Sequence, residues 1–294
     1  MMEKFGRIYD MRISTPNGDN IAISLPWSLD VDITRSSTPT ANVGQFKLYN
    51  LPEHIRNKIR FDISSISERQ EVALKAGYKS IHKNLNDLPL IFRGSIKYAF
   101  SERQGVDWIT TIECYDGGFA IANSKINASF IAGEKFTSNV EKVLATFGSV
   151  KIGHISKKLI PPDKKIMRGH PVDAKTFDYL NENFSNNWFI DNGIVNILGD
   201  EEAFVGIYKK INVDTGLLST PIREETNISF NMIFEPRLLI GQAIDLESVT
   251  DPAFNGTYKL ITIKHRGTIS PVVSGELVTS CRVFKGTGKL EVVA

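Results

Sequence analysis

Short segments in which apolar and polar residues alternate fill the first 120 residues, and they limit the fold more than any other feature of the chain. Alternation with a period of two is typical of strands with one buried face. Turn signals such as Pro16-Asn17-Gly18-Asp19 separate the segments. We therefore expect a sandwich or barrel of short strands. The expected strands are Ile8–Ile13, Ile21–Leu25, Leu29–Ile33, Gln45–Tyr49, Val72–Tyr78, Leu90–Phe100 and Val106–Cys114.

One short helix interrupts this β-rich part. After Pro52, Ile55 and Ile59 recur at helical spacing with charged residues between them, which predicts an amphipathic helix. A closed or stacked set of strands does not need this helix. We therefore expect that something outside the strands makes use of it.

The middle of the chain changes its period. Val140, Val143, Leu144 and Phe147 predict a helix that Ser138 and Glu141 would cap and Gly148 would end. A second helix is expected from Asp173. Asn-Gly between two apolar runs then predicts a hairpin over Trp188–Leu198 that turns at Asn192-Gly193. These features indicate a small α/β unit over residues 128–200.

The last part of the chain is β-rich again and repeats an order of events from the first. A strand, a proline, a second strand, a Phe-x-Gly triplet and a long hairpin follow one another in both parts. The triplets are Phe92-Arg93-Gly94 and Phe254-Asn255-Gly256, and each glycine is expected at the start of its hairpin. Punctuation by proline and glycine is common in β proteins, so duplication and coincidence both stay open.

Composition narrows the class of protein. The 294 residues are 41% hydrophobic and 23% charged, with a net charge of +2, so no bulk basicity suggests nucleic acid or an anionic membrane. Cys114 and Cys281 are the only cysteines, which favours a reducing compartment over a disulfide framework. We expect no signal peptide and no membrane span.

No pattern of residues indicates catalysis, a cofactor or a metal site. The histidines have no partner at metal-ligand spacing, and neither cysteine has a CxxC partner. Glu113 and Asp116 lie three apart on a strand, so they face opposite sides. "FKGTGKL" has the wrong glycine spacing for a phosphate loop. The basic stretch Lys151–His170 could contact a polyanion, but a solvated loop is the simpler interpretation.

The order of several longer motifs resembles a known family. "FKLYNLPEHIRNKI", "VALKAGY" and "LIFRGSIKYAFSERQGVDWITTIECYDGGFAIANSKIN" are similar to the N-terminal half of bacteriophage baseplate central hub proteins, related to late control D proteins and to the hub part of type VI secretion spikes. The likeness continues through "FIAGEKFTSNVEKVLATFG", "RGHPVDAKTFDYLNENFSNNWFIDNGIVNIL" and "GLLSTPIREETNISFNMIFEPRLLIGQAIDLES".

This resemblance implies a mainly β protein with an α+β insert. It implies two tail-tube-like β-barrel domains, at residues 1–127 and 201–294, with the α/β domain at 128–200 between them. It also implies a homotrimer that adapts a six-fold tail tube to a three-fold central spike, and a helix near Ile55 that covers a barrel end or a neighbouring barrel. The partners would be the tail tube protein, the spike and other baseplate proteins.

Two further expectations follow from the resemblance. The channel would make transient contact with genomic DNA or the tape measure protein. No membrane would be among the partners of the protein. The protein would be assembled in the bacterial host cytoplasm and would reside in the virion baseplate. Two alternatives are a tail-tip cell-wall hydrolase and a peptidoglycan-binding module built on the middle unit. The sequence names neither the host nor the tail type.

Overall fold

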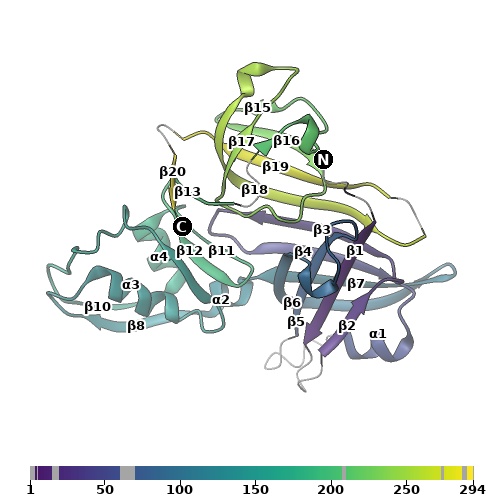
Figure 1. Ribbon diagram of the computed structural model, residues 1–294. Helices are drawn as coiled ribbons and strands as arrows, with labels where there is room; N and C mark the ends of the chain where they lie inside the picture. Colours follow the sequence, from purple (N-terminus) through teal and green to yellow (C-terminus); the bar gives the residue numbers. More distant parts are fainter. Residues whose placement is uncertain are drawn as a thin grey trace.

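Most of the chain forms one large, mainly antiparallel sheet (Figure 1). A computed structural model describes residues 4, 6–14, 20–59, 70–206, 210–272, 275–286 and 290–293. The described part of the large sheet has thirteen strands, and its longest path runs β15-β16-β19-β18-β3-β4-β7-β6-β5-β1-β2. Its strands are β1 (Arg7–Ser14), β2 (Asn20–Ser24), β3 (Leu29–Ser36), β4 (Asn42–Tyr49), β5 (Glu71–Tyr78), β6 (Leu90–Gln104), β7 (Asp107–Asp116), β14 (Lys210–Ile211), β15 (Ile222–Glu224), β16 (Asn227–Ile233), β17 (Ala243–Leu246), β18 (Gly256–Ile269) and β19 (Leu277–Phe284).

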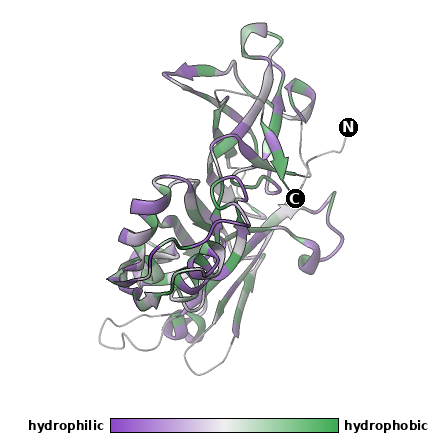
Figure 2. Ribbon diagram, turned by 90° about the vertical axis from the view of Figure 1, so that its left-hand side faces the viewer, coloured by the Kyte–Doolittle hydropathy of each residue, from purple (hydrophilic) through white to green (hydrophobic). Residues whose placement is uncertain are grey.

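The first β part follows the alternation in the sequence. In β3 and β4 every second residue is buried, and Figure 2 shows hydrophobic and hydrophilic residues interleaved along the ribbon. The buried residues of this part form one core, which includes Phe46 and Phe92. Helix α1 (Glu53–Ile59) confirms the predicted short helix, with Ile59 buried and Ile55 half-buried against that core. The turn expected at Pro16–Asp19 lies outside the described residues, but β1 and β2 on either side of it pair antiparallel.

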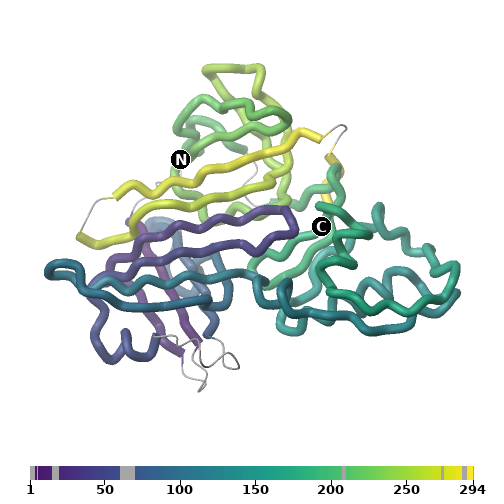
Figure 3. Tube along the Cα trace, turned by 180° about the vertical axis from the view of Figure 1, so that it is seen from behind, coloured from purple at the N-terminus to yellow at the C-terminus, as the bar shows by residue number. Residues whose placement is uncertain are grey.

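The two β parts meet in a single seam. Strand β18 pairs antiparallel with β3 over eight residue pairs, from Thr262 opposite Ser36 to Ile269 opposite Leu29. Figure 3 shows β18 and β19 running beside β3 and β4 as neighbouring strands of one sheet. This seam joins segments more than 200 residues apart in the chain, so the two β parts share a continuous surface.

The same order of five strands occurs in both β parts. The first part contains β3-β4-β7-β6-β5, and the last part contains β15-β16-β19-β18-β17, with antiparallel neighbours throughout. Both long hairpins also carry one irregularity in register, between Ile96 and Tyr98 in β6 and between Leu260 and Thr262 in β18. The repeated order of events in the sequence therefore corresponds to a repeated strand order.

The expected equivalence of the two glycines is wrong. Gly256 is the first residue of β18, whereas Gly94 is the fifth residue of β6. When the two register irregularities are superposed, Gly256 corresponds to Phe92, two positions before Gly94. The reason why each position favours glycine differs as well. A Cβ on Gly94 would meet the Tyr115 backbone at 2.9 Å, whereas Gly256 has a φ of +155°, which other residues rarely adopt.

Closed barrels are not found among the described strands. The path through the large sheet is open and ends at β2 and at β15. In the sheet, the neighbour of β17 is the two-residue strand β14, which pairs with it in parallel, and the neighbour of β5 is β1, which pairs with it antiparallel. The two β parts are therefore curved sections of one open sheet in the single chain.

The middle unit packs its helices and small sheets around a separate core that includes Trp188 and Leu144 (Figure 1). The third core lies in the last β part and includes Phe230 and Leu260. The remaining elements are α2 (Gly118–Asn123), β8 (Lys125–Phe130), α3 (Phe136–Ala145), β9 (Lys151–Ile155), β10 (His170–Lys175), α4 (Thr176–Phe184), β11 (Trp188–Asp191), β12 (Ile194–Ile197), β13 (Glu202–Phe204), β20 (Glu291–Val293) and the 3-10 helices Leu85–Asp87, Val213–Thr215 and Pro252–Phe254.

The two longer helices of this unit begin elsewhere than predicted. Helix α3 starts at Phe136 after Lys135, which makes no side-chain cap, so Ser138 lies inside the first turn. Helix α4 starts at Thr176, because Asp173 belongs to β10 and pairs with Asn127 of β8. In both places tertiary pairing overrides the local capping signal.

The predicted hairpin is confirmed. Strands β11 and β12 pair antiparallel with Asp191 opposite Ile194, so Asn192 and Gly193 form a two-residue turn. Their φ angles are 53° and 76°, the positive values that a type I′ turn requires. The Gly193 amide also donates to Asp116 Oδ1 at 2.9 Å, which attaches the turn to the end of β7.

Replacing Gly193 with valine should destabilise the protein by about 1 kcal/mol or more, because a β-branched residue resists positive φ. Chemical denaturation measures the effect. Gly193→Asn is the matched control, because asparagine tolerates this conformation and keeps the amide. If the valine variant unfolds at the same denaturant concentration as the parent, strain in the turn is not significant.

Candidate functional surface

One face of the large sheet is mostly polar across eight neighbouring strands, from β15 to β6, with the exposed apolar side chains Ile222 and Phe100 on the two outer strands. Residues directly opposite each other in antiparallel strands lie on the same face. The register places two rows of residues on this face. One row is Ser229, Arg282, Thr262 and Ser36, and the other is Arg266, Asp32, Gln45, Glu113 and Tyr98, with Lys264 between the two rows on β18. The opposite face carries the apolar cores.

Glu113 is the most enclosed acid on this face. Its carboxylate accepts hydrogen bonds from Tyr98 at 2.6 Å and from Tyr115 at 2.8 Å, and Lys97 Nζ lies 3.4 Å away. Burial alone would raise the pKa of Glu113, but the two tyrosine hydroxyls and Lys97 outweigh it and lower the pKa. Glu113 is therefore a charged anchor that holds β6 and β7 together.

The other acids of the face also connect neighbouring strands. Asp32 of β3 lies 3.4 Å from Lys264 Nζ and 3.8 Å from Arg266 Nε, both on β18, so it bridges the seam. Asp30 accepts from Thr268 at 2.5 Å and from Tyr49 at 2.6 Å. The hydrogen bond to Asp30, together with burial, raises the pKa of Tyr49 to about 12.

The same arrangement recurs in the last β part. Arg282 of β19 contacts Glu224 of β15 at 2.6 Å, and Ser229 donates to the same carboxylate at 2.9 Å. The face is thus rich in hydroxyl groups and has cations paired with acids across strands. A shallow groove of about 400 Å³ follows the seam, with Asp30, Asp32, Gln45, Glu113 and Arg266 among its lining residues.

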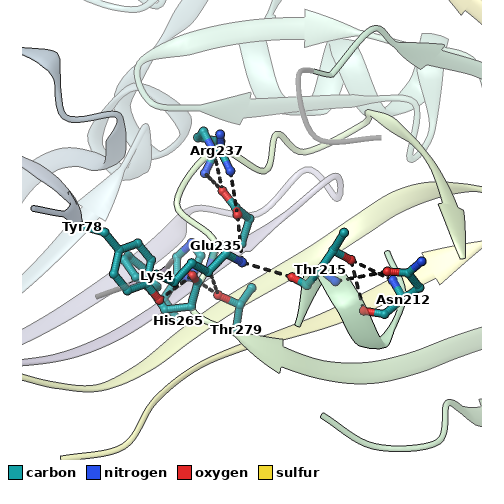
Figure 4. A network of polar contacts seen from close by, with 9 residues as sticks. Lys4, Tyr78, Asn212, Thr215, Glu235, Arg237, His265 and Thr279 are labelled. Carbon is teal, nitrogen blue, oxygen red and sulfur yellow. Dashed lines mark hydrogen bonds and ion pairs between the residues drawn. The ribbon is translucent and has the colours of Figure 1, made fainter. Parts of the chain in front are cut away.

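A buried ionic cluster fastens the two β parts behind this face (Figure 4). Glu235 is fully buried, and its carboxylate contacts Lys4 at 3.1 Å and Arg237 at 2.8 Å. Burial alone would raise the pKa of Glu235, but Arg237 and Lys4 more than compensate, and the pKa is lowered. Lys4 also donates to the Thr215 carbonyl, so the N-terminal segment is attached to the last β part.

Phe234 adds contacts to this cluster that cross between the parts. Tyr78 of β5 donates to the Phe234 carbonyl at 2.9 Å, and the ring of Phe234 packs in the first core. His265 of β18 is fully buried and hydrogen-bonded to Thr279, and burial lowers its pKa to about 3. His265 is therefore neutral at physiological pH and serves as a core residue.

A second buried cluster fixes the middle unit on the first β part. Arg35 of β3 is 1% exposed, and its guanidinium binds both oxygens of Asp191, at 2.7 and 2.6 Å. Asn42 donates to the Ile190 carbonyl at 2.9 Å. Because Asp191 ends β11, these contacts orient the whole hairpin. Asp116 lies in the same junction, and burial, with the neighbouring charge of Asp191, raises its pKa to about 7.

The raised pKa of Asp116 predicts a pH dependence of stability. The unfolded chain releases this proton near the ordinary value of 3.8, whereas the folded protein holds it until about pH 7. Folding therefore binds a proton in this interval, and the free energy of unfolding should fall as the pH rises from about 4 to about 7. Asp116→Asn should remove this part of the slope, as melting at pH 5 and pH 8 would show.

The control for this experiment is Asp163→Asn, which changes an exposed loop residue. It should leave the difference between the melting temperatures at pH 5 and pH 8 as it is in the parent. An Asp116→Asn variant with the parental difference would show that Asp116 is ionised throughout and that Arg35 dominates its environment.

The residues weighed from the sequence as catalytic or metal-binding candidates are not brought together. Cys114 and Cys281 are buried in separate cores, and Glu113 and Asp116 have separate partners. In the described ranges no group of three or more His, Cys, Asp or Glu side chains could hold a metal ion. Residues 287–289 of the glycine-rich stretch lie outside the described residues.

The remaining two expectations concern a polyanion and a membrane. In the basic stretch Lys151–His170, Lys158 pairs with Glu291 and Lys164 lies over the Phe136 ring, so part of its charge serves internal contacts. No helix within the described segments combines the length and apolarity needed to cross a bilayer.

Solved structures of two tail proteins and of a type VI secretion component share this fold. The fold is similar to a 43 kDa tail protein of prophage MuSo2 from Shewanella oneidensis (TM-score 0.60, 9% identity, 94% of this chain and 96% of that chain). It is also similar to a tail protein from Neisseria meningitidis (TM-score 0.60, 9% identity, 96% and 97%). An Escherichia coli type VI secretion component, described as structurally similar to the T4 tail proteins gp27 and gp5, matches with TM-score 0.53 and 9% identity over 88% and 74%.

Sequence comparison gives the family directly. No curated protein matches the chain in sequence. A family profile described as baseplate hub gp41 matches residues 11–267, which is most of the chain. This agrees with the resemblance seen in the motifs, and the chain belongs to the baseplate hub gp41 family.

Proposed function

We propose that three copies of this chain form the baseplate hub that adapts a six-fold tail tube to a three-fold central spike. The observation that carries the proposal is the five-strand order found twice in the chain. Three chains with two such units each present six similar units on one side and three identical surfaces on the other. A duplicated unit is thus a direct way to match the two symmetries.

The polar face of the sheet is suited to line the channel of this hub. Tight binding of DNA requires unpaired cations that neutralise phosphates. On this face Lys97, Lys264, Arg266 and Arg282 all lie beside acids of the same face. A wall with paired charges and hydroxyl groups stays wet and lets DNA or the tape measure protein pass without holding them. DNA ejection through the hub is the role that this surface supports.

The hub is proposed to be a structural protein of the virion tail without catalytic activity, assembled in the host cytoplasm. In this proposal the first tube-like unit spans residues 1–127, the α/β unit spans residues 128–200 and the second tube-like unit spans residues 201–294. A cell-wall hydrolase would reduce the turbidity of cell-wall suspensions, and a peptidoglycan-binding module would be retained on purified peptidoglycan. We expect the pure protein to do neither.

The deciding experiment is the mass of the purified protein, measured by light scattering alone and with co-expressed tube and spike proteins. When its partners are present, a hub should form complexes that contain three copies of this chain. The partners are included because ring closure can depend on binding them. A protein that stays monomeric with both partners in excess would contradict the proposed trimer.

A further inference from the structure

The internal repeat shows how two of these units join edge to edge. The seam within the chain pairs β18 of the second unit with β3 of the first. On the polar face Asp32 bridges this seam to Lys264 and Arg266. In the repeated strand order, β18 corresponds to β6 and β3 corresponds to β15. The counterpart of the seam would therefore join β6 to β15, which lie at opposite ends of the eight-strand face.

Both of these counterpart strands have a free edge. Strand β15 pairs only with β16 among the described strands. Strand β5 pairs with β6 from Leu90 to Ser95, which leaves Tyr98–Gln104 with β7 as its described partner strand. An unpaired edge presents a row of amides and carbonyls that another strand can complete. Among the described strands these two edges do not pair with each other within one chain.

We infer that β6 of one copy pairs antiparallel with β15 of a second copy of this chain, reproducing between chains the β18–β3 seam within the chain. The inference rests on the proposed ring and adds which edges form its interface and in which register. Superposing the register irregularities makes Tyr98 equivalent to Thr262 and Gln45 equivalent to Ser229. The same pairings then make Asp32 equivalent to Ile222.

These equivalences predict the contacts between the copies. In the seam within the chain, Lys264 faces Thr34, His265 faces Ile33 and Arg266 faces Asp32. The counterpart positions place Phe100 opposite Glu224, Ser101 opposite Arg223, and Glu102 opposite Ile222 of the neighbouring copy. Phe100 and Ile222, which are 45% and 63% exposed in the single chain, would then become diagonal neighbours on one face.

The surroundings of the β6 edge fit an incoming strand. A groove of about 550 Å³ lies between this edge and helix α1, with Glu53, Arg56, Phe100, Ser101 and Trp108 among its lining residues. Arg223 would enter this groove opposite Ser101 and bring its cation to Glu53. Within the described part of the chain neither Glu53 nor Arg223 forms an ion pair.

The inference also gives helix α1 a role. Helix α1 connects β4 to β5, and its counterpart in the second unit is the segment between β16 and β17. That segment already packs across the seam within the chain, since Phe234 lies in the first core and Glu235 binds Lys4. By the same relation, α1 would pack against the second unit of the neighbouring copy. Within the chain, Ile59 and Ile55 of α1 pack on the first core, and the ring would bring the second unit of the neighbouring copy against the rest of the helix.

Two cysteine pairs test the inference in the full-length protein, purified with its tube and spike partners. The first pair is Ser101→Cys with Arg223→Cys, and the second is Phe100→Cys with Glu224→Cys. Opposite pairs alternate between wide and close Cα separations, so one of these two adjacent pairs has the close geometry. After mild oxidation we expect most chains of that variant to run as a covalent trimer on a non-reducing gel. The native Cys114 and Cys281 are buried and should not contribute.

The controls separate failure of this inference from failure of the proposed function. Asn20→Cys with Arg223→Cys joins β15 to the other free edge, β2, and should give no covalent oligomer. If light scattering shows trimers but neither test pair links, or if the β2 pair links instead, the β6–β15 interface is wrong and the trimeric hub stands. If the protein remains monomeric with both partners present, both proposals are overturned.

Discussion

Replacing Arg35 with alanine should lower the free energy of unfolding by about 3–5 kcal/mol, the usual cost of breaking a buried ion pair on one side. The substitution leaves Asp191 without the guanidinium that binds both of its oxygens, next to the buried Asp116. Both acids would then have to share a site with no cation. Urea denaturation followed by tryptophan fluorescence measures the loss.

The double variant Arg35→Met with Asp191→Asn is the informative comparison. It removes both charges together and keeps much of the side-chain volume, so it should recover a large share of the lost stability. Arg266→Ala is the surface control. This arginine is largely exposed and lies 3.8 Å from Asp32, so its loss should cost no more than about 1 kcal/mol. If the single and double variants of Arg35 are equally unstable, packing rather than charge explains the loss.

The alternation of residues in β3 already indicates that Arg35 is buried. Leu29, Val31 and Ile33 fill the buried face of β3, and Arg35 follows in the same phase. A charged residue that continues an apolar phase must find a buried partner, because an unpaired buried charge is very costly. The identity of that partner, Asp191, could not be predicted, since it lies 156 residues away on a hairpin of another unit.

The elements with local causes were predictable, and those with distant causes were not. The hairpin at Asn192-Gly193 and the helix around Ile59 depend on turn chemistry and local spacing. The β18–β3 seam depends on backbone pairing between segments that carry no mutual local signal, so the expected separate barrels became parts of one sheet. The prediction that a helix begins at Asp173 is wrong for the same reason, because the pairing of Asp173 with Asn127 overrides its capping preference.

On the polar face, too, features with local causes were predictable and contacts between distant segments were not. In β3 Asp30 and Asp32 alternate with the buried Leu29, Val31 and Ile33, so the local pattern alone indicates that the two acids lie away from the core. Which cations they face was set by the seam, because Lys264 and Arg266 come from the other end of the chain. The family resemblance gave the class of protein from ordered motifs, whereas the surface behind the proposed channel role could be recognised only from the register of eight strands.

Replacing Trp188 with alanine should destabilise the middle unit by about 3–5 kcal/mol, the range for removing a large buried aromatic side chain. Trp188 is fully buried in the core of that unit. Its ring stacks on Phe147 with centroids 6.0 Å apart, and its edge contact with Phe177 has a centroid distance of 5.8 Å. The indole nitrogen donates to Asn181 Oδ1 at 2.9 Å, so the substitution also leaves a polar group without its donor.

This variant distinguishes a separate middle unit from a single cooperative protein. The core around Trp188 is distinct from the two cores of the large sheet, so hydrogen exchange should speed up in α3, α4 and β11 while β3, β4 and β18 keep their protection. Trp108→Ala, at a partly exposed site on β7, is the size-matched control and should leave the middle unit unchanged. Faster exchange in β3 and β18 as well would mean that the Arg35–Asp191 junction couples the units, and that residues 128–200 do not unfold on their own.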